Sequence, residues 1–582
     1  MNTSMKVIVV VIAVLAASVA RGAFSAPARS EQGMVATAHP LATEAALAIL
    51  RAGGNATDAA IAAAFAISVV EPFSAGIGGG GFAVLHFEPT PKDAGAIKAL
   101  DFREVAPARA TRDMYIGTDG KVAEGLSRDG YSSVAVPGTV AGLAEMHRAH
   151  GRLPWRKVVA PAIRLARDGF VVDDHFVGAF EWRKDVLARF ASTRAVFMKT
   201  TATGDVPYAI GDRLRQPDLA RSLEDIAADP RSFYVGRIAR AIAADMHKNG
   251  GLVTLEDLKA YQARWRDPLC GGWRGHNVCT MPPPSSGGVH LLQILNLLGN
   301  TDFDKAGWHS EQSLHLMIES MRIAYADRAM HLGDPAFTKV PVVDLVSPAY
   351  ATLRSREIDP KRAKKSADVK AGTQAQLDQA RRARESRDTS HLTVVDRDRN
   401  AVSLTFTVNY GFGSGVVVPR TGVLLNDEMD DFAAAPGVPN AYGLLGGEAN
   451  SVQPGKVPLS SMTPTIVTRE GRFFLSAGAP GGSTIITTTL QTLLHVIAFQ
   501  MDCQAAVAAP RIHHQWLPDV VSIERFGLDE GTQKALEARG HVLRVSNDGW
   551  GNAMCVARRT DNGRDLLEGG ADPRGIGLAR GL

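Results

Sequence analysis

The sequence lacks most of the patterns that mark common catalytic and binding sites. Its four cysteines show no metal-site spacing, which excludes a cysteine-rich zinc centre. No glycine-rich loop ends in Lys-Ser or Lys-Thr, and no Gly-x-Ser-x-Gly elbow joins a strand to a helix, so a P-loop and a serine-hydrolase elbow are excluded. The formal net charge is only +4, too small to indicate nucleic acid or an acidic membrane surface as a partner.

Two other patterns are present without the context that a site needs. Gly76 to Gly81 fits the glycine spacing of a dinucleotide fingerprint, but a predicted helix precedes it and a predicted strand follows. The fingerprint requires the reverse order, so we expect no dinucleotide site. His513-His514 has no third ligand nearby, so we expect no metal site there either.

Long hydrophobic runs are missing beyond the N-terminus. Lys6 is followed by a short apolar stretch from Val7 to Ala20 and then by small residues up to Ala28. This pattern predicts a signal peptide over residues 1–23, with its end between 20 and 28. The mature protein would be exported, to the periplasm or the medium, with no membrane association. An uncleaved anchor is the alternative, although the run is short for a bilayer.

The remaining composition is that of a large globular chain. The sequence is 45% hydrophobic and 21% charged, and its 57 glycines cluster in short runs that predict tight turns or close backbone contacts. Cys270 and Cys279 flank a possible two-residue turn at Arg274-Gly275, which would place them opposite each other. In an oxidising compartment they could form a disulfide; a reduced pair is the alternative.

The character of the chain changes near residue 388. Before it, helices are predicted at 41–52 and 57–70 and through most of 137–330, with strands at 81–87 and 97–102. After it come predicted strands at 390–396, 401–409, 415–418, 423–425, 465–468 and 472–477, then a helix at 483–499. This order predicts sheets covered by helices, an α/β or α+β layering. A basic stretch at 361–387 without aromatic residues reads as a solvated linker.

The first of these later strands carries a candidate nucleophile. If the strands on either side of Arg397-Asp398-Arg399 pair as a hairpin, Thr389 faces Thr407. A threonine hydroxyl is a weak nucleophile that needs a base. As a new N-terminus, Thr389 would supply its own α-amine, with a pKa of about 8. A plain threonine-rich strand is the alternative.

A glycine-rich turn before the last predicted helix could serve the same chemistry. Gly481 and Gly482 precede the helix predicted to begin at Ser483, where free backbone N–H groups point out of the helix end. Such groups suit the oxyanion of an acyl transfer. An ordinary turn is the alternative.

Several long motifs, in the same order along the chain, resemble those of the γ-glutamyltranspeptidase family of N-terminal nucleophile hydrolases. The resemblance runs from about Met34 to the C-terminal region. The motifs are Asp101-Phe102-Arg103-Glu104, Pro282-Pro283-Pro284-Ser285-Ser286-Gly287-Gly288, Asp388-Thr389-Ser390-His391, Leu425-Asn426-Asp427-Glu428-Met429-Asp430-Asp431-Phe432, Pro458-Leu459-Ser460-Ser461-Met462-Thr463-Pro464, Ala479-Pro480-Gly481-Gly482-Ser483 and Pro510-Arg511-Ile512-His513-His514-Gln515-Trp516.

The resemblance implies an α+β chain with a four-layer αββα fold that processes itself into two subunits. Thr389 would cut the bond after Asp388 and then act as the nucleophile, with Thr407 bonded to its hydroxyl. The large subunit would span 24–388, with a flexible linker at 361–388, and the small catalytic subunit 389–582. The two would remain a heterodimer. Gly481 and Gly482 would form the oxyanion hole, with no cofactor and no metal.

The resemblance also implies how the substrate is bound. Arg103 would clamp an α-carboxylate, assisted by Ser460 and Ser461. The residues expected to accept hydrogen bonds from an α-ammonium are Asn409, Glu428 and Asp431. Tyr442, in a lid loop at 436–447, would cover the bound group.

The implied activity is transfer of a γ-glutamyl group from glutathione or another γ-glutamyl amide, through a Thr389 ester, to water, an amino acid or a peptide. A cephalosporin (glutaryl) acylase or a poly-γ-glutamate-processing enzyme is the alternative within the enzyme class. Because a glutaryl group lacks the amine, Asp431 favours the γ-glutamyl substrate. An inactive protein that binds γ-glutamyl compounds is the alternative outside it.

Overall fold

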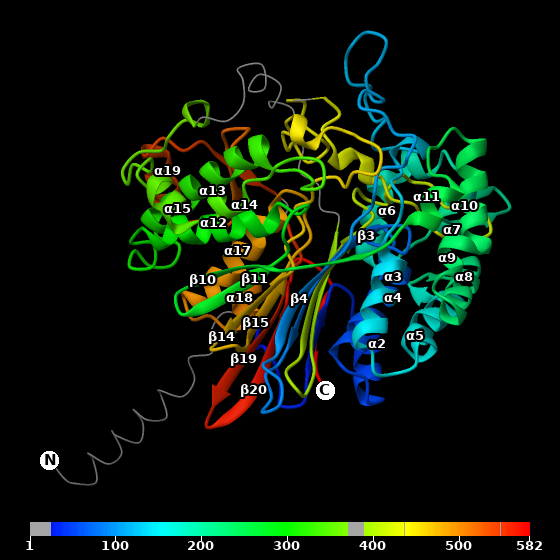
Figure 1. Ribbon diagram of the computed structural model, residues 1–582, viewed down its shortest axis with the longest axis horizontal. Coiled ribbons are helices and arrows are strands. Elements are labelled where there is room, and N and C mark those ends of the chain that lie inside the picture. Colours follow the sequence, from blue (N-terminus) through cyan, green and yellow to red (C-terminus); the bar gives the residue numbers. More distant parts are fainter. Residues whose placement is uncertain (1–24, 370–388, 436, 548) are drawn as a thin grey trace.

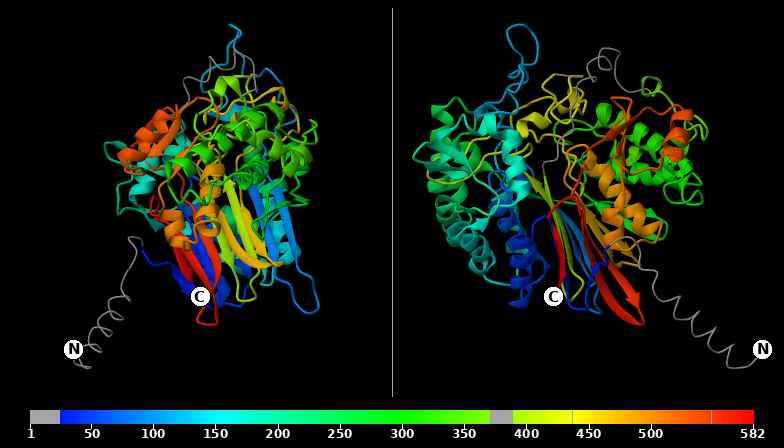
Figure 2. Two further views of the ribbon diagram at one scale, coloured as in Figure 1. Left: turned by 90° about the vertical axis from the view of Figure 1, so that its left-hand side faces the viewer. Right: turned by 180° about the vertical axis from the view of Figure 1, so that it is seen from behind.

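Two seven-stranded sheets lie face to face between two layers of helices (Figures 1 and 2). The computed structural model describes residues 25–369, 389–435, 437–547 and 549–582. The α+β class and the four-layer αββα arrangement predicted from the sequence are therefore confirmed. The predicted signal peptide, Asp388 and most of the predicted linker lie outside the described residues.

Each sheet has its own strand order, and neighbouring strands within both sheets are antiparallel. The first sheet runs β1 (Ala28–Ser30), β20 (Arg564–Ala571), β19 (Met554–Asp561), β15 (Arg472–Gly478), β14 (Thr465–Arg469), β11 (His276–Thr280) and β10 (Leu269–Trp273). The second runs β21 (Leu578–Gly581), β2 (Met34–Thr37), β12 (Ser390–Val395), β13 (Ala401–Thr407), β3 (Gly80–Phe87), β4 (Ala96–Phe102) and β9 (Arg264–Arg266).

Both sheets combine strands from before and after residue 389. In the second sheet, β12 pairs with β2 on one side and with β13 on the other, and β13 pairs with β3. In the first sheet, β11 pairs with β14 and β1 pairs with β20. A cut before Thr389 would therefore leave two chains joined by shared hydrogen-bond ladders and a shared core.

One helical layer covers the outer face of the second sheet (Figure 1). Its central helix α3 is buried at every position, because its alanines allow close packing all round. Asn55 and Asp58 form a capping box at its start, and the helix begins at Ala56, one residue before the predicted 57. The layer contains α2 (Pro40–Arg51), α3 (Ala56–Val70), α4 (Thr139–His150), α5 (Trp155–Asp168), α6 (Asp174–Leu187), α7 (Ala191–Phe197), α8 (Pro217–Ala228), α9 (Ser232–Val235), α10 (Arg237–Lys248) and α11 (Leu255–Ala260).

The other helical layer covers the first sheet and has a separate apolar core (Figure 1). It contains α12 (Gly287–Gly299), α13 (Glu311–His331), α14 (Val342–Leu345), α15 (Pro348–Ser355), α17 (Thr484–Ile497), α18 (Cys503–Ala508) and α19 (Glu530–Ala538). Smaller sheets join β16 (Ile512–His513), β17 (Val521–Glu524) and β18 (Leu543–Ser546), β5 (Phe170–Val171) with β8 (Arg213–Leu214), and β6 (Met198–Thr201) with β7 (Gly204–Pro207).

The structure overturns one strand prediction, describes the first part of the predicted linker and decides a choice that the sequence left open. Residues 415–418 and 423–425 are not strands; only an isolated bridge joins Val417 to Leu424. The predicted linker is packed over 361–369, where the Ser366 carbonyl accepts a hydrogen bond from the Trp516 indole. Cys270 and Cys279, whose state the sequence left open, form a disulfide across β10 and β11.

A second disulfide, which the sequence did not predict, joins Cys503 to Cys555. Among the helices of the described residues, none has the length and apolar character needed to cross a bilayer.

Candidate active site

The β12–β13 hairpin brings two threonine hydroxyls together at the start of β12. The register pairs Thr393 with Ser403 and His391 with Thr405, which is the alignment that the predicted pairing of Thr389 with Thr407 requires. One step further along the ladder, the Thr389 hydroxyl donates to the Thr407 hydroxyl at 3.4 Å. Thr389 is 6% exposed. The candidate nucleophile therefore sits at a strand end, with a second hydroxyl directly across from it.

Backbone contacts fix the position of Thr407. The Asn409 N–H donates to its hydroxyl at 2.8 Å. The glycine run at 76–81 lies against the same strand end, and a Cβ built on Gly79 would be 1.8 Å from the Thr407 carbonyl oxygen. Only glycine allows this approach. The glycine run that resembles a dinucleotide fingerprint thus packs directly against the backbone of β13.

The one histidine on this face of the hairpin is not a base. His391 is fully buried, and its Nδ1 lies 2.8 Å from the Thr405 hydroxyl. Burial lowers its pKa from 6.5 to about 3, so the imidazole takes up a proton only weakly and is a poor base. A base for Thr389 must come from elsewhere.

Gly482 lines the same cavity as Thr389, and Gly481 precedes it directly at the start of α17. Both have positive φ, 128° and 56°, a region that side chains rarely adopt. Ser483 caps the helix, which begins at Thr484, one residue later than predicted. Among the described residues, no carbonyl or side chain accepts from the N–H of either glycine. Buried N–H groups without an acceptor are rare, and they suit an incoming oxyanion.

The other end of the site is a buried cluster of charges. Arg103, just after β4, forms ion pairs with Glu428 and Asp431 and lies 3.6 Å from Glu104. Burial raises the pKa of Glu104 to about 7, and that of Glu428 well above its usual value, against the pull of Arg103. Burial likewise raises the pKa of Asp431.

Tyr442 covers one side of the site. Its hydroxyl donates to the Asn409 side-chain oxygen, and a Cβ built on Gly482 would be 2.4 Å from its ring. The Gln515 amide donates to the Gly443 carbonyl at 3.2 Å and so holds this loop in place.

One cavity of about 20 Å³ joins nearly all of the predicted site residues. That volume holds about one water molecule. Gly481 adjoins the cavity without lining it, and Asp388 lies outside the described residues. The lining includes Arg103, Thr389, Thr407, Asn409, Glu428, Asp431, Tyr442, Ser460, Ser461 and Gly482.

One residue at the edge of this cavity was missed by the sequence analysis. Arg328 on α13 reaches the Ser286 hydroxyl at 3.1 Å and the Ser461 hydroxyl at 3.5 Å. The only signal in the sequence is that α13 carries charged residues on every side and yet lies within a predicted helical layer.

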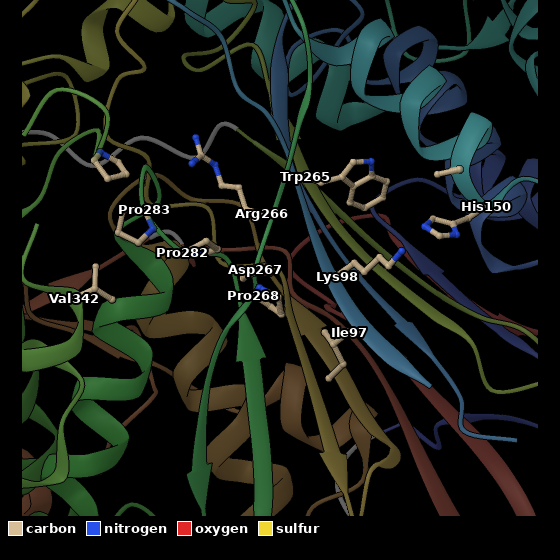
Figure 3. Close-up of a pocket in the computed structure, with 12 residues that line it drawn as sticks. Ile97, Lys98, His150, Trp265, Arg266, Asp267, Pro268, Pro282, Pro283 and Val342 are labelled. Atoms are coloured by element: carbon tan, nitrogen blue, oxygen red, sulfur yellow. The ribbon is translucent and has the colours of Figure 1, made fainter. Parts of the chain in front are cut away.

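Two other places could be taken for ligand sites. His315, Glu319 and His541 place three potential metal ligands within 4.8 Å of one another. However, the two histidines share a hydrogen bond of 2.8 Å, and Arg322 already neutralises Glu319. A cavity of about 650 Å³, lined by Lys98, His150 and Trp265 among others, shares no residue with the threonine site (Figure 3).

Comparisons with known proteins agree with this geometry. Residues 42–582 match the family described as Gamma-glutamyltranspeptidase. The chain is 44% identical to the glutathione hydrolase proenzyme of Escherichia coli, over 94% of this chain and 92% of that protein. It is also similar to a cephalosporin acylase structure from Bacillus halodurans (TM-score 0.81, 30% identity, 97% and 98% of the two chains) and to Helicobacter pylori gamma-glutamyltranspeptidase (TM-score 0.55, 38% identity, 61% and 97%).

Proposed function

The chain belongs to the gamma-glutamyltranspeptidase family, and from that premise we propose that it transfers γ-glutamyl groups from glutathione and related amides to water, amino acids or peptides. The observation that carries the proposal is the shared cavity of Thr389, Gly482, Arg103 and Asp431. It combines an acyl-transfer centre with groups of both charges, as a zwitterionic acyl donor requires.

The first step is self-cleavage before Thr389. Its hydroxyl attacks the carbonyl carbon of Asp388, the amide nitrogen leaves as the new α-amine, and water hydrolyses the resulting ester. The products are a large subunit ending at 388 and a small subunit of residues 389–582. The shared strand ladders of β12 with β2 and of β13 with β3 support a stable heterodimer.

In each later turnover the same hydroxyl attacks the γ-carbonyl of the substrate. The Thr389 α-amine takes the hydroxyl proton, while the Thr407 hydroxyl orients the nucleophile. The Gly481 and Gly482 N–H groups stabilise the oxyanion, and the leaving amine takes the proton. The γ-glutamyl ester then passes to water or to an amine acceptor. No step requires a metal or a cofactor.

The charged end binds the zwitterion by exchanging partners. Arg103 and Asp431 pair with each other in this structure. A substrate that inserts its α-carboxylate toward Arg103 and its α-ammonium toward Asp431 replaces one buried ion pair with two. Ser460 and Ser461 add donors to the carboxylate, and Glu428 and Asn409 add acceptors to the ammonium. Because the cavity is too small for the acyl group, Tyr442 must move to admit it.

Export is part of the proposal. The N-terminal pattern predicts a signal peptide, and the two disulfides in the described residues suit an oxidising compartment such as the periplasm or the medium. Cell fractionation, with N-terminal sequencing of the large subunit, tests this part.

Acyl-group preference separates this proposal from its alternatives. A glutaryl group lacks the ammonium and would leave Asp431 without its ligand. We expect γ-glutamyl-4-nitroanilide to be cleaved at least about 100-fold faster, in kcat/KM, than glutaryl-4-nitroanilide. A preference for the glutaryl compound would favour an acylase; activity only on poly-γ-glutamate would favour a polymer-processing enzyme; no turnover of any of them would favour a binding protein.

A further inference from the structure

Arg328 is an exception among the buried arginines of the described chain. It is 5% exposed, and no carboxylate of a described residue lies within ion-pair distance of it. Each of the other buried arginines faces a carboxylate: Arg103, Arg183, Arg322, Arg399 and Arg511. A buried cation is strongly disfavoured unless an anion compensates it, so the missing partner needs an explanation.

The carboxylate that acts on Arg328 is already engaged. Burial lowers the pKa of Arg328 to about 10, against the opposing effects of Tyr325 and of Asp431, and Asp431 pairs with Arg103. Arg328 therefore contributes a positive charge to the site that Arg103, surrounded by Glu104, Glu428 and Asp431, does not.

The hydrogen bonds of Arg328 set the direction of the serine hydroxyls. Its guanidinium donates to the Ser461 hydroxyl oxygen at 3.5 Å, so the Ser461 proton is free to point into the cavity that Ser461 lines. It also donates to Ser286 at 3.1 Å, and Ser286 donates in turn to the Ser460 carbonyl at 2.8 Å. A guanidinium behind a hydroxyl makes that hydroxyl a stronger donor.

The same helix also supports the oxyanion end. Tyr325 lies one turn before Arg328 on α13, and its hydroxyl donates to the Ser483 carbonyl at 2.6 Å, next to Gly482. The serine motif at 282–288 thereby gains a role: it ties α13 to the loop that carries Ser460 and Ser461.

We propose that Arg328 is a positioning residue whose counter-ion is the α-carboxylate of the γ-glutamyl substrate, contacted through the Ser461 hydroxyl. The inference rests on the proposed function. It assigns carboxylate binding to two cations. Arg103 must release a carboxylate of the protein to bind that of the substrate, whereas Arg328 forms no ion pair with the described residues before the substrate binds. It predicts that Arg328 contributes to binding of the substrate carboxylate and does not affect binding of the ammonium or of the acyl chain.

The test compares two substrates that differ only in that carboxylate, γ-glutamyl-4-nitroanilide and 4-aminobutyryl-4-nitroanilide. For Arg328→Met, we expect KM for the first to rise about 30-fold, with kcat within about threefold, and kcat/KM for the second to stay within about twofold. Arg328→Lys, which retains the charge, should recover most of the loss. Arg399→Met, a buried arginine at the far turn of the hairpin, should change neither substrate.

Equal losses on both substrates, or none on the first, would overturn the assignment and leave Arg328 a structural tether. If Arg328→Met fails to split into two chains, Arg328→Lys is tested by inhibition: the inhibition constant of L-glutamate should rise about fivefold and that of 4-aminobutyrate should not, and equal changes would again refute it. A wild-type enzyme that cleaves neither anilide would instead refute the proposed function.

Discussion

The two ends of the candidate site differ sharply in charge. At the nucleophile end, Thr389 and Thr407 meet glycine N–H groups, and the nearby His391 is neutral. At the recognition end, Arg103 is packed among carboxylates, whereas no carboxylate of the described residues forms an ion pair with Arg328. The described side chains beside Thr389 offer no strong base, and an α-amine freed by cleavage would provide one. The second end needs a ligand that carries both charges.

The two ends are also built differently. The nucleophile end is formed by the β12–β13 ladder, and the register of this ladder fixes where the Thr389 and Thr407 hydroxyls lie. The recognition end is assembled from loops: Arg103 follows β4, Glu428 to Asp431 form a single 3₁₀ turn, and Ser460 lies between strands. Rigid strands suit chemistry that needs fixed distances, and loops suit groups that must exchange partners.

The largest expected effect comes from removing the nucleophile. Thr389→Ala should remain one uncut chain and lose at least about 10⁴-fold in kcat/KM, because both cleavage and acyl transfer require the hydroxyl. Thr389→Ser retains a hydroxyl and should still split, more slowly. A denaturing gel and the anilide assay measure both effects. Cleavage of the alanine variant at the same bond would show that the nucleophile lies elsewhere.

The next effect is at the charged end. Asp431→Asn keeps the shape of the side chain but removes the charge that faces the ammonium. We expect kcat/KM for γ-glutamyl-4-nitroanilide to fall about 10³-fold, because a buried charge pair is broken, while the rate on glutaryl-4-nitroanilide stays the same or rises. Equal losses on both compounds would mean that Asp431 merely holds Arg103 in place.

The sequence predicted the nucleophile end of the site more completely than the recognition end. Side chains alternate between the two faces of a strand, so locating the turn of the hairpin was enough to predict which threonines face each other. The predicted register at Thr389 agrees with the observed ladder. The family motifs then placed Arg103, Asp431 and the serines in one site. Arg328 was missed because α13 shows no apolar stripe; its burial depends on the layers around it. The packing of 361–369 was missed because its contacts, such as Ser366 with Trp516, join positions far apart in sequence.

Removing the Thr407 hydroxyl should have a smaller effect, and it should show whether this hydroxyl orients the nucleophile or binds the substrate. Thr407→Val keeps the side-chain shape but removes the hydroxyl that receives the Thr389 hydrogen bond. We expect kcat to fall about 30-fold and KM to change less than twofold, because the lost contact orients the nucleophile and does not touch the charged groups. Ser403→Ala, two positions down the same face, is the matched control and should leave kcat unchanged. A change in KM alone would place Thr407 at the recognition end instead.

The smallest kinetic effect should come from His391, because burial lowers the pKa of its imidazole to about 3 and so makes it a poor base. The acid limb of the pH profile of kcat/KM should report the Thr389 α-amine, near pH 8 or below, and should move by less than about 0.3 in His391→Gln. Stability should respond instead. The folded pKa of about 3 lies below the ordinary value of 6.5, so the unfolded chain takes up the proton first and stability present above pH 6.5 is lost as the pH falls. Between pH 6.5 and 5, wild type should lose about 2 kcal/mol relative to His391→Gln in denaturant unfolding. A shifted acid limb with unchanged acid stability would reverse the comparison and make His391 part of the proton transfer.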